Sequence, residues 1–175
     1  MGAWGIPMSL RIRNESTSDA AKIEALTEEA FRTAEHTSHT EQFIVNALRR
    51  AGKLSISLVA EIEGEIVGHI AVSPVSISDG SEGWYGLGPI SVLPSHQKHG
   101  IGTKLMEEVI NALKKTGAPG CVLLGDPLFY KRFGFKVIPE IILSGVPPEY
   151  FQALPLKAQI PNGEVTYHEA FNAKS

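Results

Sequence analysis

The order of apolar and polar residues predicts a chain in which strands and helices follow one another. Alternation in residues 10–16, 54–64, 65–77 and 163–171 is typical of strands with one buried face. Glu63-Gly64-Glu65 separates two of these runs and predicts a hairpin turn. Residues 84–93 are also predicted to form a strand, and residues 134–138 to lead into one. The continuous apolar run at 121–125 indicates a strand buried on both faces.

Apolar residues recur at helical spacing in three other segments. The first helix is expected within residues 16–31, capped by Ser18 or Asp19. The second begins at Thr40 and ends before Gly52, and the third begins near residue 101. A brief helical segment is expected at 127–133. The residues predicted to face the core are Ile23, Leu26 and Ala30 in the first helix, Phe43, Ile44, Ala47 and Leu48 in the second, and Ile101, Leu105, Val109, Ala112 and Leu113 in the third.

This order of segments predicts a single mixed α/β domain, with a central strand–helix–strand unit at residues 84–124. We see no internal repeat and no linker, so the domain is expected to cover residues 8–175. Residues 1–7 are expected to be a tail or a remnant preceding the natural start at Met8. Prolines at positions 139, 147, 148, 155 and 161 predict that the segment before the last strand is loop-like.

Composition restricts the class of protein. The chain has 175 residues, 43% hydrophobic and 20% charged, which is ordinary for a soluble domain with its own core. A net charge of −3 gives no general footprint for nucleic acid. No apolar run approaches the roughly 18 residues that span a bilayer, and the first residues do not form a convincing signal peptide. We expect a cytoplasmic protein, monomeric or homodimeric, that binds neither nucleic acid nor membranes.

The stretch "SHQKHGIGTKLMEE", residues 95–108, follows a predicted strand and opens a predicted helix. The first backbone N–H groups of a helix have no partner within the helix, and the helix dipole is positive at that end. Glycine at positions 100 and 102 lets an anion approach the backbone closely. A phosphate site is therefore one interpretation of this stretch, and a tight turn before an ordinary helix is the other.

Two common phosphate-binding motifs do not fit these residues. A P-loop requires G-x-x-x-x-G-K-[ST], and here "GTK" has those elements in the wrong order. A dinucleotide fingerprint requires a third glycine, and position 105 is leucine.

The pattern Q-x-x-G-x-G after a strand resembles the GNAT superfamily of acyl-CoA N-acyltransferases. A second block, "FYKRFGF" at residues 129–135, is similar to the late F-Y-x-x-x-G-F signature of that family. The resemblance is strong over residues 84–136 and weak after Pro139. It implies an α/β GNAT fold, with a mixed, mostly antiparallel sheet flanked by helices. The chain departs from the family at Gly125-Asp126-Pro127, where many members have an asparagine that bonds to the cofactor arm.

The resemblance also implies which residues bind acetyl-CoA, or coenzyme A after the reaction. Backbone groups of the strand, at Ile90, Ser91 and Val92, would pair with the pantetheine arm like an added strand. The loop would surround the pyrophosphate with its backbone amides. The residues that it contributes are Gln97, Lys98, His99, Gly100, Ile101, Gly102 and Thr103.

Tyr130 matches the tyrosine of the late signature, which implies a catalytic role. A phenol with a pKa of about 10 stays protonated at pH 7, and a thiol with a pKa of about 8.5 is a reasonable leaving group. The phenol can donate a proton or a hydrogen bond as the intermediate collapses. The alternative is that Tyr130 is a core aromatic residue beside Phe129 and Phe133.

The base that deprotonates the acceptor amine cannot be chosen from the sequence. Glu82 precedes the cofactor strand, and His69 lies among apolar residues, where a structural histidine is the favoured interpretation. Three more candidates lie between the first two helices: Glu35, His36 and His39.

Cys121 lies in an apolar run without any sign of thiolate activation, so packing is favoured over a role as acyl carrier. As the only cysteine it cannot form an intrachain disulfide, which fits a reducing compartment. No spacing of residues suggests a metal site.

We therefore expect an acetyl-CoA-dependent N-acetyltransferase that acts on a primary amine of a small molecule or peptide. The amine would attack acetyl-CoA directly in a ternary complex. Two alternatives stay open: a non-catalytic acyl-CoA-binding sensor, and transfer of a longer acyl group.

Overall fold

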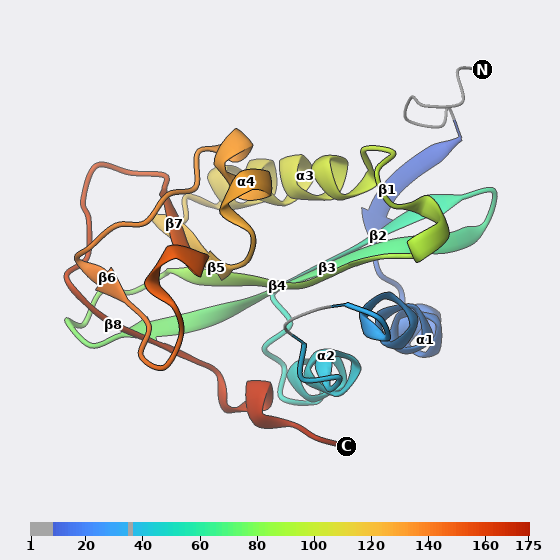
Figure 1. The fold of residues 1–175 in the computed structure, drawn as a ribbon, viewed down its shortest axis with the longest axis horizontal. Helices are drawn as coiled ribbons and strands as arrows, with labels where there is room; N and C mark the ends of the chain where they lie inside the picture. The colour runs from blue at the N-terminus through green and yellow to red at the C-terminus, as the bar shows by residue number, and fades with distance from the viewer. Residues whose placement is uncertain (1–8, 35–36) are drawn as a thin grey trace. The chain divides into compact units, whose positions relative to one another are not determined.

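A computed structural model describes residues 9–34 and 37–175 (Figure 1). Residues 1–7, expected to be a tail, lie outside the described residues, as do Glu35 and His36. The α-helices are α1 (Ala20–Phe31), α2 (Glu41–Arg50), α3 (Ile101–Thr116) and α4 (Pro127–Tyr130). The strands are β1 (Leu10–Asn14), β2 (Ile56–Ile62), β3 (Glu65–Ile77), β4 (Tyr85–Val92), β5 (Gly120–Leu124), β6 (Ile141–Ile142), β7 (Phe151–Pro155) and β8 (Gly163–Tyr167). Short 3-10 helices occur at Thr17–Asp19, Pro94–His96, Lys131–Phe133, Pro148–Tyr150 and Glu169–Asn172.

Hydrogen bonds order the strands β1-β2-β3-β4-β5-β7, with β8 paired to β3 and to β6. The pairs β1–β2, β2–β3, β3–β8 and β5–β7 are antiparallel, whereas β4–β5 and β6–β8 are parallel. The predicted class, a mixed and mostly antiparallel sheet with flanking helices, is confirmed. The predicted hairpin is confirmed too: Glu63 and Gly64 both have left-handed backbone angles, with φ of 51° and 82°.

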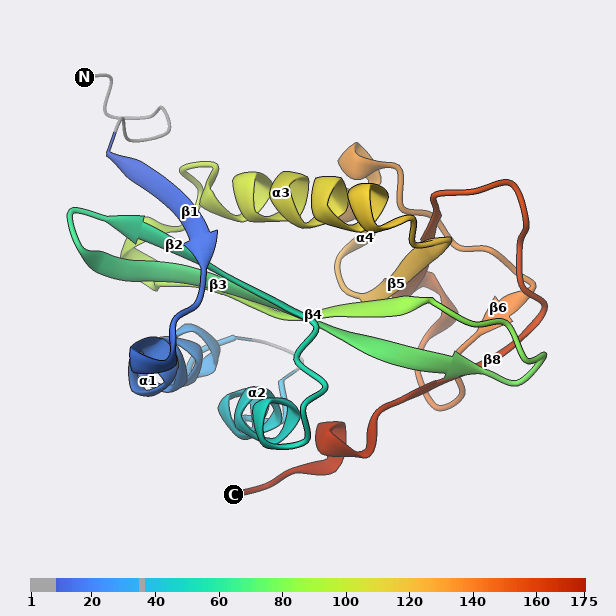
Figure 2. The same cartoon turned by 180° about the vertical axis from the view of Figure 1, so that it is seen from behind.

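The chain divides into two compact units, of which unit 1 consists of Met1–Val72, Pro89–Val109 and Glu169–Ser175. In unit 1, α1 and α2 cover one face of β1–β3, as both views show (Figures 1 and 2). Ile23 of α1 and Val45 of α2 pack there against Val59 and Ala71 of the strands. The first turns of α3 cover the other face, because a Cβ on Gly68 would lie 3.1 Å from Ile101 and 3.2 Å from Leu105.

Unit 2 consists of Ser73–Gly88 and Ile110–His168. Its core gathers apolar residues from β3, β5, β6, β7 and β8 and from the segments beside them. Trp84 belongs to this core and is almost fully buried. Its ring occupies the space that a side chain on Gly120 would need, where β5 begins. The members of this core are Ile77, Trp84, Val122, Ile138, Ile141, Phe151, Ala153 and Val165.

Two local predictions were wrong. Neither Ser18 nor Asp19 caps α1 through its side chain, because the Asp19 carboxylate instead accepts the Ser16 backbone N–H at 2.7 Å and pairs with Arg13. Residues 134–138 lead into a strand, as predicted: Lys136 forms a single bridge with Ala153, and the two-residue strand β6 follows.

The second error concerns β7, which lies in the segment predicted as loop-like. It pairs with β5 over five residues, and its proline stands at the last position, where it does not interrupt the ladder. None of the described helices has the length and apolar character needed to cross a membrane.

Candidate functional site

The loop between β4 and α3 exposes backbone N–H groups in unit 1. The first bond of the helix runs from the Lys104 N–H to the Gly100 carbonyl at 3.0 Å. The N–H groups of Gly100 and of the next three residues, through Thr103, have no acceptor in the described part of the chain. Four consecutive donors at the positive end of a 16-residue helix are suited to an oxyanion.

Two left-handed residues shape this loop. Lys98 has a φ of 66° and Gly100 a φ of 83°, and such turns make successive N–H groups converge on one side. Gln97, predicted to bind the cofactor, donates its side-chain Nε2–H to the Val92 carbonyl at 3.1 Å. Gln97 thus ties the loop to the end of β4, and its side chain serves the conformation of the loop.

The second half of β4 is the edge strand of unit 1. This half of β4 lies beside β3 in the sheet and contains Ile90, Ser91 and Val92. Just beyond it, the Leu93 N–H donates to the Val67 carbonyl of β3 at 2.9 Å. Within the part of the chain that the structure describes, β4 pairs in register with β5 at Tyr85–Cys121 and Gly86–Val122, both in unit 2. The edge of β4 at residues 90–92 can therefore take an extended ligand arm as an added strand.

Tyr130 lies in unit 2, at the end of α4. Asp126 caps this short helix, since its carboxylate accepts the Leu128 N–H at 2.9 Å and its carbonyl accepts the Tyr130 N–H at 3.1 Å. The tyrosine ring contacts Phe129 and Phe135 edge to face, at centroid distances of 4.8 and 6.2 Å.

The Tyr130 side chain is nearly buried, but its hydroxyl has no hydrogen-bond partner among the described residues. Burial, and then the negative charge of Asp126, raise the pKa of the phenol to about 12. The hydroxyl is thus a protonated donor at every physiological pH. The arrangement unites the two sequence interpretations, because the ring packs as a core aromatic while the hydroxyl stays available.

His69, a candidate base, is completely buried on β3 within a polar network of unit 1. Ser57 donates to the Glu15 carboxylate at 2.5 Å, so His69 must donate its Nε2–H to Ser57, at 2.8 Å. Arg49 completes the network with bonds of 2.8 and 3.0 Å to Glu15. Burial lowers the pKa of His69 to about 4, although the charge of Glu15 opposes the shift. This geometry favours the structural role.

The other described candidates for the base, His39 and Glu82, are exposed. His39 has a left-handed φ of 60° just before α2. Cys121 is completely buried in β5, and burial raises the pKa of its thiol to about 12. The thiol is therefore protonated at pH 7, which is consistent with a packing role.

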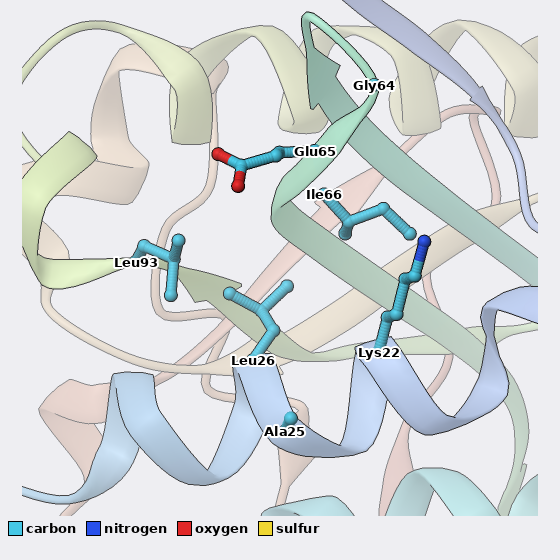
Figure 3. Close-up of a pocket in the computed structure, with 7 residues that line it drawn as sticks. All are labelled: Lys22, Ala25, Leu26, Gly64, Glu65, Ile66 and Leu93. Atoms are coloured by element: carbon cyan, nitrogen blue, oxygen red, sulfur yellow. The ribbon is translucent and has the colours of Figure 1, made fainter.

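An open cavity of about 380 Å³ lies in unit 1, between α1, the β2–β3 hairpin and the end of β4 (Figure 3). Leu26, Ile66 and Leu93 give it an apolar surface, with the charged groups of Lys22 and Glu65 at its sides. None of the predicted cofactor residues lines it. The cavity is thus distinct from the donor groups of the loop.

Sequence reasoning missed two features of these regions. Gly88, with a φ of 129°, gives the continuous strand β4 an irregular backbone just before Pro89, and proline inside a strand could have indicated this irregularity. The other is Gln152, a polar residue of β7 that is 1% exposed. Its Nε2–H donates to the Gly125 carbonyl at 3.0 Å. Nothing in the sequence connects residues 125 and 152, because the strand that brings them together was not predicted.

Comparisons with known proteins agree on one family. A model of the acetyltransferase (GNAT) domain matches residues 53–137. The protein YhbS of Escherichia coli K12, named an uncharacterized N-acetyltransferase, is 34% identical over 168 residues. That alignment covers 92% of this chain and 98% of YhbS.

Two solved structures share the fold. A GNAT family acetyltransferase from Brucella melitensis, crystallised with acetyl-CoA, is 49% identical with a TM-score of 0.83, over 93% of this chain and 97% of the other. Escherichia coli YhbS, crystallised with CoA, is 31% identical with a TM-score of 0.85, over 97% and 95% of the two chains.

Proposed function

The chain belongs to the GNAT acetyltransferases, and on this premise we propose that it transfers the acetyl group of acetyl-CoA to a primary amine of a small molecule or peptide. The observation that carries the proposal is the row of four backbone donors from Gly100 to Thr103. Acetyl-CoA and CoA in the Brucella and Escherichia structures support the choice of ligand. Residues 8–175 would act as one acetyltransferase domain.

The two parts of acetyl-CoA would use different features of unit 1. The pyrophosphate would accept hydrogen bonds from the loop amides, from Lys98 through Thr103, with added attraction from the helix dipole. The pantetheine arm carries amide groups that would pair with the backbone of Ile90, Ser91 and Val92. The exposed side chain of Lys98 would add only a screened attraction, of about 1 kcal/mol or less.

The reaction would be a direct attack in a ternary complex. The nitrogen of the neutral amine bonds to the carbonyl carbon of the thioester and gives a tetrahedral intermediate. The carbon–sulfur bond then breaks, sulfur takes its electron pair, and the nitrogen loses one proton. The products are an amide and free CoA thiol, so the proton lost by nitrogen balances the proton gained by sulfur.

Tyr130 would stabilise the departing sulfur. Its pKa of about 12 lies above the ordinary thiol value of about 8.5, so at equilibrium the proton stays on the phenol oxygen. A hydrogen bond from the phenol to the thiolate is therefore the main contribution that we assign to it. The interaction exists only once sulfur carries charge, so it lowers the barrier without tightening ground-state binding.

A screen for turnover tests the proposal. Purified protein is incubated with acetyl-CoA and a panel of amines and peptides, and the release of free thiol is followed. Acceptor-dependent thiol release, with an acetylated product seen by mass spectrometry, is the expected result. Calorimetric binding of acetyl-CoA without turnover of any acceptor would instead favour the acyl-CoA-binding sensor. Faster turnover of a longer acyl-CoA would favour transfer of that group.

A further inference from the structure

Gln152 is a fully buried carboxamide in unit 2 that the proposed reaction does not use. It lies on β7 opposite Leu123 of β5, and it is 1% exposed. Its Nε2–H reaches beyond the end of β5 to the carbonyl of Gly125, at 3.0 Å. Burial of a carboxamide costs desolvation free energy. The hydrogen bond of Gln152 therefore either stabilises the fold or fixes the position of the group that it binds.

Gly125 is the residue at which the chain leaves β5 for α4, and both of its backbone polar groups are held. Its N–H donates to the Tyr150 carbonyl at 3.0 Å, and its carbonyl accepts from Gln152. The ring of Tyr130 lies against its Cα. A Cβ added at this position would come within 2.9 Å of the ring carbon Cδ2 and closer still to Cε2.

The contacts of Gly125 explain why its carbonyl needs the hydrogen bond from Gln152. Only glycine leaves room for the Tyr130 ring, but glycine also has the greatest backbone freedom of any residue. If the Gly125 carbonyl lost its donor, this peptide group could rotate and the ring that packs on it would follow. The Tyr130 hydroxyl has no hydrogen-bond partner among the described residues, so no hydrogen bond of its own would hold it in place.

We propose that Gln152 is a positioning residue for acetyl transfer, which fixes Gly125 and thereby holds the Tyr130 hydroxyl where the thiolate forms. The proposal rests on the proposed function of Tyr130. It predicts that loss of the Gln152 donor lowers kcat and leaves the KM for acetyl-CoA nearly unchanged, because Tyr130 acts only when sulfur carries charge.

Gln152→Glu gives a donor that can be switched by pH. The neutral acid can donate its O–H to the Gly125 carbonyl, whereas the ionised form has no proton to donate and repels that oxygen. Burial and a neighbouring carbonyl both raise the pKa of such a carboxyl group. The ratio of the variant's kcat to that of the wild type should therefore rise as pH falls. Gln152→Met, which has no donor, should be slow at every pH, by about 10-fold or more.

Gln159 provides the matched control, because it is an exposed glutamine of the same unit. Gln159→Glu should follow the wild-type pH profile. A Gln152→Glu ratio that does not change with pH, or that falls on acidification, would overturn the positioning role. If Gln152→Met does not fold, the pH-dependent comparison in Gln152→Glu carries the test by itself.

A double-mutant cycle separates the two proposals, with rates measured in single turnovers. If Gln152 acts through Tyr130, then Gln152→Met should slow wild type but add no further loss to Tyr130→Phe. Equal losses in both backgrounds would overturn the positioning role and leave the function of Tyr130 intact. A wild-type rate in Tyr130→Phe alone would overturn both. Absence of any acetyl transfer by the wild type would overturn the proposed reaction itself.

Discussion

The two regions proposed to handle acetyl-CoA differ in what they offer to it. The loop of unit 1 offers backbone N–H groups, four of them in a row from Gly100 to Thr103. The turn of unit 2 offers one side-chain hydroxyl, on Tyr130, held by packing on Gly125 and on two phenylalanine rings. The first site depends on where glycine lets the chain turn, and the second depends on the neighbours of one ring.

This difference has a consequence for substitutions. The proposed binding groups of the loop are backbone N–H groups, and the Gln97 and Lys98 side chains are exposed, so exchange of side chains should matter little unless the backbone path changes. In the turn the backbone only supports the ring, and loss of a single oxygen atom should remove the function. Binding should therefore respond to changes at the loop glycines, and chemistry to changes at Tyr130.

Removal of the Tyr130 hydroxyl should give the largest effect. Tyr130→Phe keeps the ring and its packing, so the fold and the affinity for CoA should persist. The rate of the chemical step should fall by roughly 10²–10⁴, the range for a positioned proton or hydrogen-bond donor. Single-turnover kinetics measure this step without interference from product release, and a rate equal to wild type would make Tyr130 a packing residue.

A change at Gly100 tests whether the loop of unit 1 binds CoA. Gly100→Asp adds a Cβ at a φ of 83° and a negative charge beside the proposed pyrophosphate site. Loss of one or two charge-assisted hydrogen bonds should weaken CoA binding by about 100-fold. Calorimetry measures the affinity, and circular dichroism checks the fold.

Gly52→Asp is the matched control for this change. Gly52 has a similar φ of 70° and open space around its Cα, so the substitution brings the same backbone strain at a place outside the loop. CoA affinity should stay at the wild-type value. Unchanged binding in folded Gly100→Asp would show that the pyrophosphate does not bind at this loop.

His69 allows a test of whether a buried polar group in unit 1 serves stability. Its pKa is about 4 in the folded protein and about 6.5 when unperturbed. Below pH 6.5 the unfolded chain binds a proton at His69 that the folded protein does not bind. The free energy of unfolding therefore decreases as the pH is lowered from 6.5 to about 4. The loss should reach about 2 kcal/mol at pH 5, from a difference of 1.36 kcal/mol per pKa unit.

Urea unfolding at several pH values measures this effect. His69→Gln should remove most of the slope between pH 6.5 and 4, whereas exposed His39→Gln should keep it. The lowered pKa of Glu15 acts in the same direction at more acidic pH, so some acid sensitivity should remain in both variants. Equal slopes in wild type and His69→Gln would contradict the assignment.

The loop of unit 1 could be predicted from the sequence more completely than the turn of unit 2. Glycines at 100 and 102 followed by a helical pattern are local signals, so the loop and α3 could be predicted from neighbouring residues. The family signature implied a role for Tyr130, but its support by Gly125 and Gln152 could not be foreseen. This support depends on β7, which has the sequence FQALP. Its glutamine is buried, so the strand lacks the strict apolar–polar alternation that predicts a half-buried strand. Contacts across 27 residues of sequence leave no local pattern.

The smallest effect on rate is expected at Cys121, the one thiol of the chain. An acyl carrier would need a thiolate, but burial in β5 raises the pKa of this thiol to about 12. Cys121→Ala should therefore leave initial rates within a few-fold of wild type and cost about 1 kcal/mol of stability through lost packing. Thermal unfolding and steady-state assays measure the two quantities. Mass spectrometry of protein incubated with acetyl-CoA alone gives the decisive observation: an acetyl group on Cys121 that is discharged by an added amine would replace direct attack with a two-step transfer.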